Sequence, residues 1–564
     1  MKKLKLLSLV LGISVIFFAC SNGGDGGDSN PRLTNLTINA DNVIEITPEN
    51  LSIDVPDIYQ NKKAFLLAIN NTEETINVTN SRSVDSVQTG LIDNIETINE
   101  NNSFSIPAKL PELNTKFTAK INNNRAANSN TEETPVVYQL GDKKDFYGLD
   151  SNYYFKKLAA NAELKVIGKH CRIWYKEKTE IKLQNEDGDD ITDSALNALA
   201  NDFDSIFEKE TYIFGSNIPT LRFNELIDFT NCDKIDLIVY DLFDNYIEEA
   251  AVNSGIFGYF TEIDFYSQNF FDANPQDYQG YKSNECEALH IDSYWLSKNP
   301  METITTAVHE FQHLLHCVNK TVNSGGRNRS ESWFNEMLSM VCEDIMQSQV
   351  GVSDAGSPKK RLPLFNGYHI EGFTRWRDTA NDGKEDVYHS YANAYVFGAY
   401  LLRNYGIDFI KELAHSNYIN KEAITKALIA IGADEKSYNE VFSNFYNVIL
   451  NPTGSKFTLN KSVSKTYTIN DKQVLFSCDP IKLNEVKTIP SDNINEDLSE
   501  LIYGSNPNED FFGPVLLNGN WFNELDPSGM FATYLGTGEV CYDFSKVKSI
   551  DFNSNIGYYV VFVD

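Results

Sequence analysis

The chain has 564 residues, which is too long for one compact core and predicts two to four domains. Hydrophobic residues make up 41% of it and aromatic residues 12%, a composition that supports buried cores and excludes a disordered chain. Asp and Glu outnumber Lys and Arg by 79 to 48, which gives a formal net charge of -31. Because such a surface repels phosphate backbones, the charge argues against nucleic acid as a partner, and we interpret it mainly as a contribution to solubility.

The first residues, 1–20, have the pattern of a lipoprotein signal peptide. A lysine-rich start precedes an apolar run at 6–18, and then come Ala19 and Cys20. The run is too short to span a bilayer comfortably. A Gly-, Ser- and Asp-rich stretch at 21–32 follows as a flexible tether. We expect Cys20 to be the lipidated first residue of an exported protein in the bacterial outer membrane, on its inner face or at the cell surface. The alternative is an ordinary cleaved signal with an incidental cysteine.

Two parts of the chain look all-β. Short alternating strands separated by Asn and Thr clusters are expected over 33–121, as in a small β-sandwich. A polar run at 122–135 is expected to be a linker. From 456 to 564 the sequence is again strand-like, with Gly- and Asn-rich turns. No cysteine belongs to a CxxC pair, so a cysteine metal site is not expected, and the disulfide pair we favour is Cys478 with Cys541.

The central part, 136–455, mixes helices and strands. A helix is expected at 192–207, where apolar residues recur at helical spacing, and a buried strand at 235–240. A second strand, within 254–260, is a candidate for the edge of the sheet along which a peptide could bind. These patterns predict an α+β domain.

The most legible helix, at 299–320, contains the motif HEFQH. Asn299 can cap its start. His309 and His313 lie one turn apart on one face, so their two imidazoles can reach one tetrahedral ion. Glu310 lies to the side of that pair, where its carboxylate can take a proton from metal-bound water. Because the helix is otherwise apolar and expected to be buried, these polar groups would be costly without a metal or a hydrogen-bond network.

A third protein ligand is needed, with the fourth position left open for water. Gly325 and Gly326 supply a break, Ser330 can cap a second helix, and the sequence WFNEMLSMVCE follows at 333–343. His316 shares a face with the first helix's metal-binding pair. We expect it to pack between helices, because a fourth protein ligand would block the water position.

The motifs HEFQH and WFNEMLSMVCE together resemble the gluzincin metallopeptidases, in which an Asn-Glu pair on the second helix supplies the third ligand. The resemblance implies that Glu336 is that ligand and that the cofactor is Zn²⁺. It also places Glu343 where gluzincin aminopeptidases have an acidic residue that supports the site. The thermolysin branch has an acid four residues after the ligand, but Met340 stands there in this chain.

Over about 141–406 the chain resembles one gluzincin family in particular, the hyicolysin family of bacterial metallopeptidases. The similarity includes the segment YKSNECEALHID at 281–292 and the segment YANAY at 391–395. The two β-rich parts fall outside it.

A donor for the developing oxyanion is needed besides the metal. Gluzincins commonly use a downstream Tyr or His, and Tyr391 is our choice because it precedes an apolar helix. Tyr388 and His389 are competitors, and a tyrosine with only a packing role is a further alternative.

The expected architecture is multidomain, an α+β zincin/gluzincin-like catalytic domain flanked by all-β N- and C-terminal domains. In chain order its parts are a lipoprotein signal peptide at 1–20, a tether at 21–32, a β-sandwich-like domain at 33–121, a linker at 122–135, the zinc metallopeptidase domain at 136–455 and a C-terminal β-rich domain at 456–564.

The predicted function is that of an exported, lipid-anchored, zinc-dependent endopeptidase acting on proteins or peptides. One alternative keeps the fold but makes the enzyme an aminopeptidase. Another is a surface binding lipoprotein or adhesin with a catalytically inactive peptidase-like core. Against the latter, the two histidines and both glutamates of the proposed site are all present.

Overall fold

The computed structural model describes most of the central part of the chain and, outside it, only strands. The described stretches of the central part are 113, 116–119, 137–149, 154–177, 191–229, 232–242, 257–362, 364–365, 369, 372–374, 376, 386–450 and 457–481. The predicted signal peptide and tether lie outside the described residues. Within the part of the chain that is described, no helix is both long and apolar enough to cross a membrane.

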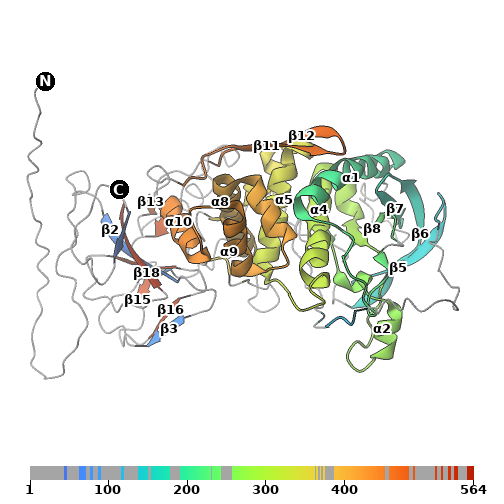
Figure 1. Ribbon diagram of the computed structural model, residues 1–564, viewed down its shortest axis with the longest axis horizontal. Coiled ribbons are helices and arrows are strands. Elements are labelled where there is room, and N and C mark those ends of the chain that lie inside the picture. The colour runs from blue at the N-terminus through green and yellow to red at the C-terminus, as the bar shows by residue number, and fades with distance from the viewer. Residues whose placement is uncertain are drawn as a thin grey trace, which may run out of the picture.

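A six-stranded mixed sheet forms one side of the central region (Figure 1). Its strands are, in spatial order, β5 (Lys143–Leu149), β6 (Phe155–Ile167), β7 (Cys171–Tyr175), β8 (Ile235–Tyr240), β10 (Ala288–Asp292) and β9 (Gly258–Tyr259). The three strands β7, β8 and β10 are parallel, and every other neighbouring pair is antiparallel. Every residue of β7, β8 and β10 is buried, because helices cover one face of these strands and apolar residues of β5 and β6 pack on the other.

Helices cover one face of this sheet and continue away from it (Figure 1). Helix α1 (Asp193–Phe214) contacts β6 and β7, and α4 (Pro300–His316) contacts β9 and β10. Helix α5 (Ser332–Val350) packs on α4, and α8 (Asp386–His415) packs on α5. Further α-helices among the described residues are the short α2 (Gln268–Ala273) and α3 (Ser293–Lys298), then α9 (Asn420–Ile431) and α10 (Tyr438–Leu450). The mixed α and β character that the sequence predicts is confirmed.

The helix that carries HEFQH begins as predicted. The side chain of Asn299 accepts a hydrogen bond from the Glu302 amide at 3.4 Å, and Pro300 occupies the first turn. The helix continues as a π-helical turn, η4 (Cys317–Val322), which local periodicity does not reveal. Gly325 and Gly326 then take φ angles of +69° and +74°, a region that favours glycine, and the predicted break is confirmed.

The predicted cap of the next helix is wrong. The residue at the N-cap of α5 is Glu331, whereas the hydroxyl of Ser330 is 2.7 Å from Nε2 of His316. The hydroxyl of Ser330 therefore bonds the buried imidazole of His316 and does not cap the helix.

The two β-rich parts of the chain meet in a second six-stranded sheet (Figure 1). Its strands are, in spatial order, β1 (Val43–Ile46), β18 (Ile556–Val563), β2 (Lys63–Asn70), β17 (Glu539–Asp543), β4 (Val87–Thr89) and β15 (Phe522–Glu524). Two further small pairs are β3 (Ile76–Thr79) with β16 (Phe531–Tyr534) and β13 (Lys487–Ile489) with β14 (Val515–Leu517). For these strands the expected separation into N-terminal and C-terminal β domains is not confirmed, because strands of both parts pair in one sheet. Alternation along one strand does not say which distant strand pairs with it.

The central region is also larger than the expected 136–455. The hairpin of β11 (Val463–Ile469) and β12 (Lys472–Cys478) contacts α8 and α5, and Phe476 and Cys478 belong to the main apolar core. Leu113 belongs to that core as well. Cys478 is a free thiol whose Sγ lies 3.6 Å from the Asp344 carbonyl oxygen, so the favoured disulfide with Cys541 is not formed.

Candidate active site

Three side chains from two helices face one another between α4 and α5. One ligand atom from each of His309, His313 and Glu336 lies within 4.8 Å of the others. Nε2 of His309 is 3.0 Å from Oε2 of Glu336, and Nε2 of His313 is 3.5 Å from the same oxygen. The spacing of the histidines puts both on one helix face, and the packing of α5 on α4 brings the glutamate opposite them. The predicted set of three side chains is therefore brought together.

The other nitrogen of each imidazole has a partner of its own. Nδ1 of His309 is 2.7 Å from Oε1 of Glu343. Nδ1 of His313 is 3.1 Å from Oδ1 of Asn335 and 3.0 Å from Oγ of Ser339. When each Nδ1 carries the proton toward these oxygens, each Nε2 presents its lone pair to the centre of the site. This donor set fits a metal ion, because ligating histidines are ordinarily oriented by such outer hydrogen bonds.

The charges around the site favour a cation. Burial alone would lower the pKa of His309, but hydrogen bonds to Glu336 and Glu343 raise it to about 10. Burial would likewise raise the pKa of Glu336, but the two histidines hold it below its ordinary value. The carboxylates of Glu336 and Glu343 therefore favour a positive charge at His309, which a divalent metal ion would supply.

Glu310 is oriented by the sheet and lies outside the three-residue cluster. Its Oε2 accepts a hydrogen bond of 2.9 Å from the backbone amide of Phe260. Burial raises its pKa, the neighbouring histidines oppose that shift, and Glu336 adds to it. A carboxylate with a raised pKa can accept a proton and hold it during a reaction.

Phe260 directly follows β9, which pairs antiparallel with β10 and is the last of the described strands of its sheet. The candidate edge strand within 254–260 is therefore confirmed at Gly258–Tyr259, while 254–256 lie outside the described residues. One edge of β9 pairs with β10. The carboxylate of Glu310 bonds the backbone amide of Phe260, directly after the strand.

Tyr391 reaches the same site from α8. Burial raises its pKa, and the charge of Glu336, that of Glu310 and a side-chain hydrogen bond to Glu336 contribute in the same direction. Arg361 opposes this shift, with its guanidinium 5.4 Å from the centre of the tyrosine ring. The competitors Tyr388 and His389 are buried in the first turn of the same helix.

Three neighbours were missed from the sequence, and one of them left a signal. Ser339 lies three residues after Glu336 and so on the same helix face, which could have identified it. Nothing in the local pattern connects Arg361 or the Phe260 amide with the histidines, because they come from separate elements. His316 bonds Ser330 and is not part of the metal cluster, which agrees with a packing role.

Comparison with known proteins gives the same assignment. The chain is 21% identical over 361 residues to the neutral metalloprotease ShpI of Staphylococcus hyicus, an alignment that covers 62% of this chain and 70% of that protein. Residues 167–471 match the Peptidase M30 family, and this range contains all of the side chains that meet at the site. The resemblance to the hyicolysin family is thereby confirmed. Because the family match spans more than half of the chain, the protein belongs to the Peptidase M30 family and is a metallopeptidase.

Proposed function

We propose that the protein is a zinc-dependent endopeptidase with a gluzincin-like catalytic domain. His309, His313 and Glu336 hold the zinc ion, and Glu310 is the general base. One observation carries this proposal. The ligand atoms of His309, His313 and Glu336 lie close together, and the carboxylate of Glu310, which accepts from the amide of Phe260, lies beside them. Two histidines and one glutamate form a ligand set of catalytic zinc sites that leaves one position open.

The protein's own groups divide the remaining work. Zinc, when bound, lowers the pKa of a water molecule and polarises the scissile carbonyl. Glu310 takes the proton of the attacking water and delivers it to the leaving amine, and the Phe260 amide restricts how its carboxylate can turn. The phenol of Tyr391 donates a hydrogen bond to the carbonyl oxygen as charge develops on it. Since burial raises the pKa of Tyr391, this phenol keeps its proton at neutral pH.

The outer edge of β9 supports internal cleavage. An extended peptide can add as a further strand beside the last strand of a sheet through its backbone, whatever its side chains are. A substrate bound in this way extends past Glu310 in both directions, which favours an endopeptidase over an aminopeptidase.

Lipid anchoring is a separate proposal that rests on the sequence. The apolar run at 6–18 followed by Ala19 and Cys20 supports an exported protein with a lipid on Cys20, held at the outer membrane.

The decisive experiment incubates the purified mature protein with a denatured protein, with and without a zinc chelator, and then restores zinc. We expect internal fragments that disappear with the chelator and return with zinc. Release of single N-terminal residues without internal cuts would identify an aminopeptidase. Binding of the denatured protein without any cleavage by the zinc-loaded protein would identify an inactive binder.

A further inference from the structure

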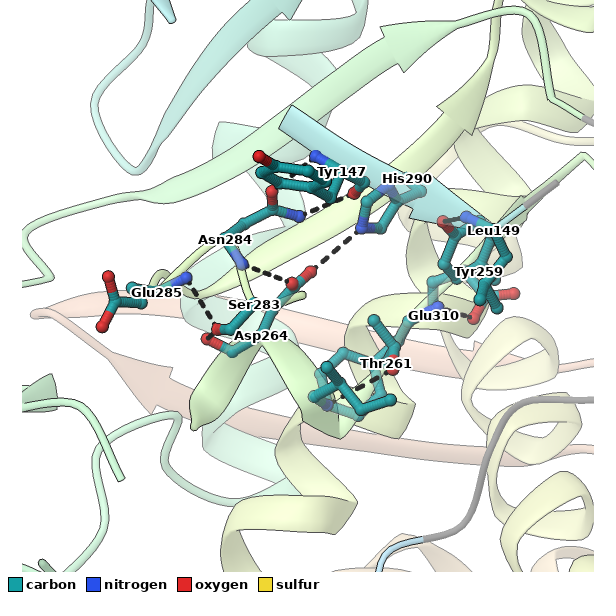
Figure 2. A network of polar contacts seen from close by, with 12 residues as sticks. Tyr147, Leu149, Tyr259, Thr261, Asp264, Ser283, Asn284, Glu285, His290 and Glu310 are labelled. Carbon is teal, nitrogen blue, oxygen red and sulfur yellow. Dashed lines mark hydrogen bonds and ion pairs between the residues drawn. The ribbon is translucent and has the colours of Figure 1, made fainter. Parts of the chain in front are cut away.

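The segment YKSNECEALHID at 281–292 has no side chain in the metal cluster, yet it builds a buried polar network behind β9 (Figure 2). Its centre is His290, in β10, which is fully buried. Nε2 of His290 is 3.0 Å from Oδ2 of Asp264, and that carboxylate is also buried. Buried polar groups are costly unless they are paired. A fully paired network of this kind makes the segments that it joins rigid.

The network runs as an unbroken chain of hydrogen bonds. The amide of Leu149 donates to the hydroxyl of Tyr259 at 3.1 Å, and that hydroxyl is 3.0 Å from the hydroxyl of Tyr240. The hydroxyl of Tyr240 is 3.0 Å from Nδ1 of His290, whose Nε2 faces Asp264. Burial raises the pKa of both phenols, so each has a proton to donate. Each group can donate one hydrogen bond to the next along the chain from the Leu149 amide to Asp264, and every donor and acceptor in it is then paired.

The His290 ring contacts one side chain on each side of Phe260 in the chain. Its ring stacks on that of Tyr259, with centroids 4.3 Å apart and planes inclined by 5°. Its Nε2 contacts Asp264, which lies in the 3₁₀ turn η3 (Glu262–Phe265) that follows β9. Phe260 lies between these two contacts in the chain and donates its amide hydrogen to Glu310.

Asp264 is in turn fixed by the segment that precedes β10. Its Oδ1 accepts from the Asn284 amide at 2.9 Å, and its carbonyl oxygen accepts from the Cys286 amide at 3.1 Å. The side chain of Asn284 bonds both the amide and the carbonyl of Tyr147 in β5. The turn after β9 is thereby connected to the opposite end of the sheet.

The strand itself is too short to fix Phe260. Two residue pairs join β9 to β10, His290 with Tyr259 and Ile291 with Gly258, and one further backbone hydrogen bond of 2.9 Å joins the Asp292 amide to the carbonyl oxygen of Phe257. A Cβ atom on Gly258 would lie 2.8 Å from the carbonyl oxygen of His290 and 2.9 Å from Cγ2 of Thr306 in α4. The strand therefore sits tightly between β10 and the metal-binding helix, and a small displacement of it would move the Phe260 amide relative to Glu310.

We propose that Asp264, His290, Tyr240 and Tyr259 are positioning residues that hold the Phe260 amide against Glu310 and so orient the general base. This proposal rests on the proposed role of Glu310. None of the four is a catalytic residue, because they act on the reaction through the backbone of Phe260.

The test compares Tyr259→Phe and Asp264→Asn with the matched control Asp236→Asn. Asp236 is as buried as Asp264, and its Oδ1 accepts from Arg172 at 2.6 Å and from Trp174 at 2.9 Å, in the same sheet but away from β9. For each variant, kcat and KM on a peptide, zinc content, thermal stability and the hydrogen exchange of the Phe260 amide are measured.

Both test variants should lose kcat by about tenfold or more, because small misplacement of a catalytic group is costly. KM should change by less than about twofold, since the lost contact acts on the chemical step. Zinc content should stay the same, and the Phe260 amide should exchange faster. The control should lose thermal stability while it keeps both kcat and the protection of that amide.

Unchanged kcat and unchanged exchange in a destabilised Tyr259→Phe would overturn the proposal and leave the role of Glu310 intact. Faster exchange with unchanged kcat would overturn it through its premise, the role of Glu310. Tyr259→Phe keeps the ring that stacks on His290, so it decides the question if Asp264→Asn does not fold.

Discussion

Glu310 directly follows His309, a proposed metal ligand, yet its carboxylate accepts from the backbone amide of Phe260 and lies outside the cluster of His309, His313 and Glu336. Glu310→Gln keeps the size of the side chain and removes the base. We expect turnover to fall by about a hundred-fold to ten-thousand-fold, with zinc content and thermal stability retained. Steady-state kinetics and metal analysis on the same preparation test this. Near-normal turnover would refute the general-base role.

The two glutamates on α5 have different proposed roles, Glu336 as a metal ligand and Glu343 as a partner of His309. Their variants should therefore differ in zinc affinity. Glu336→Ala removes a proposed ligand, so zinc should be lost on dialysis. Glu343→Gln leaves the ligands in place but weakens the contact with Nδ1 of His309, and zinc affinity should fall by about 10- to 100-fold. Titration against graded chelator measures both. Full zinc occupancy in Glu336→Ala would move the third ligand elsewhere, with Glu343 the next candidate.

Tyr391→Phe tests the oxyanion donor. A hydrogen bond that strengthens as charge develops is worth about a hundred-fold to a thousand-fold in turnover, so kcat should fall far more than KM rises. Zinc content should not change, because Tyr391 is not a ligand. Tyr388→Phe and His389→Ala serve as matched variants from the same helix turn. Wild-type turnover in Tyr391→Phe together with a collapse in one neighbour would reassign the role.

The parts of the site that share one helix could be predicted from sequence, and the parts that meet across elements could not. The spacing of His309 and His313 is sufficient to place both imidazoles on one face. Glu336 came from a family resemblance, because no local rule connects it with the histidines. The amide of Phe260 could not be foreseen, since it reaches Glu310 from a strand 50 residues earlier in the chain.

Among the helices and strands, those with a regular spacing of apolar residues could be predicted from the sequence. The strand at 235–240 and the helix that begins after Thr192 have strong apolar patterns, and both were confirmed, although the helix extends to Phe214. The π-helical turn η4 is not predicted, because side-chain spacing over a single turn does not distinguish its i→i+5 hydrogen bonds from the i→i+4 bonds of an α-helix.

That turn carries a lysine with an unusual environment. Lys320 is fully buried, and its ammonium donates to the carbonyl oxygens of Leu413 and Ser416 at the end of α8. Burial lowers its pKa to about 7. In the unfolded chain a lysine has a pKa of about 10.4, so between about pH 7 and 10 the unfolded state binds more protons than the folded state. The contribution of Lys320 to stability should therefore rise with pH across that window.

Lys320→Met isolates this effect, because it removes the titrating group and keeps a long apolar side chain. Urea unfolding of both proteins at pH 7, 8 and 9 gives the difference in their free energies of unfolding. We expect that difference to shift in favour of the wild type by up to about 1.4 kcal/mol per pH unit. A difference that stays constant with pH would show that Lys320 does not titrate in this range.

At the scale of the whole molecule, the two β-rich ends of the chain share a sheet, while the candidate metal site lies in the sequence between them. Strand β2 lies between β17 and β18, so residues near 65 pair with residues near 543 and 561. A strand's alternation identifies its buried face but not its partner, and for that reason the sequence predicted strands in both parts and missed their pairing. The hairpin β11–β12 lies within the predicted C-terminal β-rich part, yet its residues Phe476 and Cys478 belong to the main apolar core.

Attachment to a membrane is the property that concerns the molecule as a whole, and Cys20→Ala tests it. A covalent lipid stabilises membrane binding by about 0.8 kcal/mol for each buried CH₂ group, so its loss should move the mature protein from the detergent phase to the aqueous phase or leave an unprocessed precursor. Ser21→Ala is the matched control, since it changes the neighbouring residue without removing the thiol. The released Cys20→Ala protein should cleave a soluble peptide as fast as the wild type, because every proposed catalytic group lies within 260–391. Detergent partitioning and the mass of the mature N-terminus are measured for all three proteins. A wild-type protein that is processed at the same place as both variants and stays in the aqueous phase would show that the cysteine is incidental and that residues 1–19 are an ordinary signal peptide.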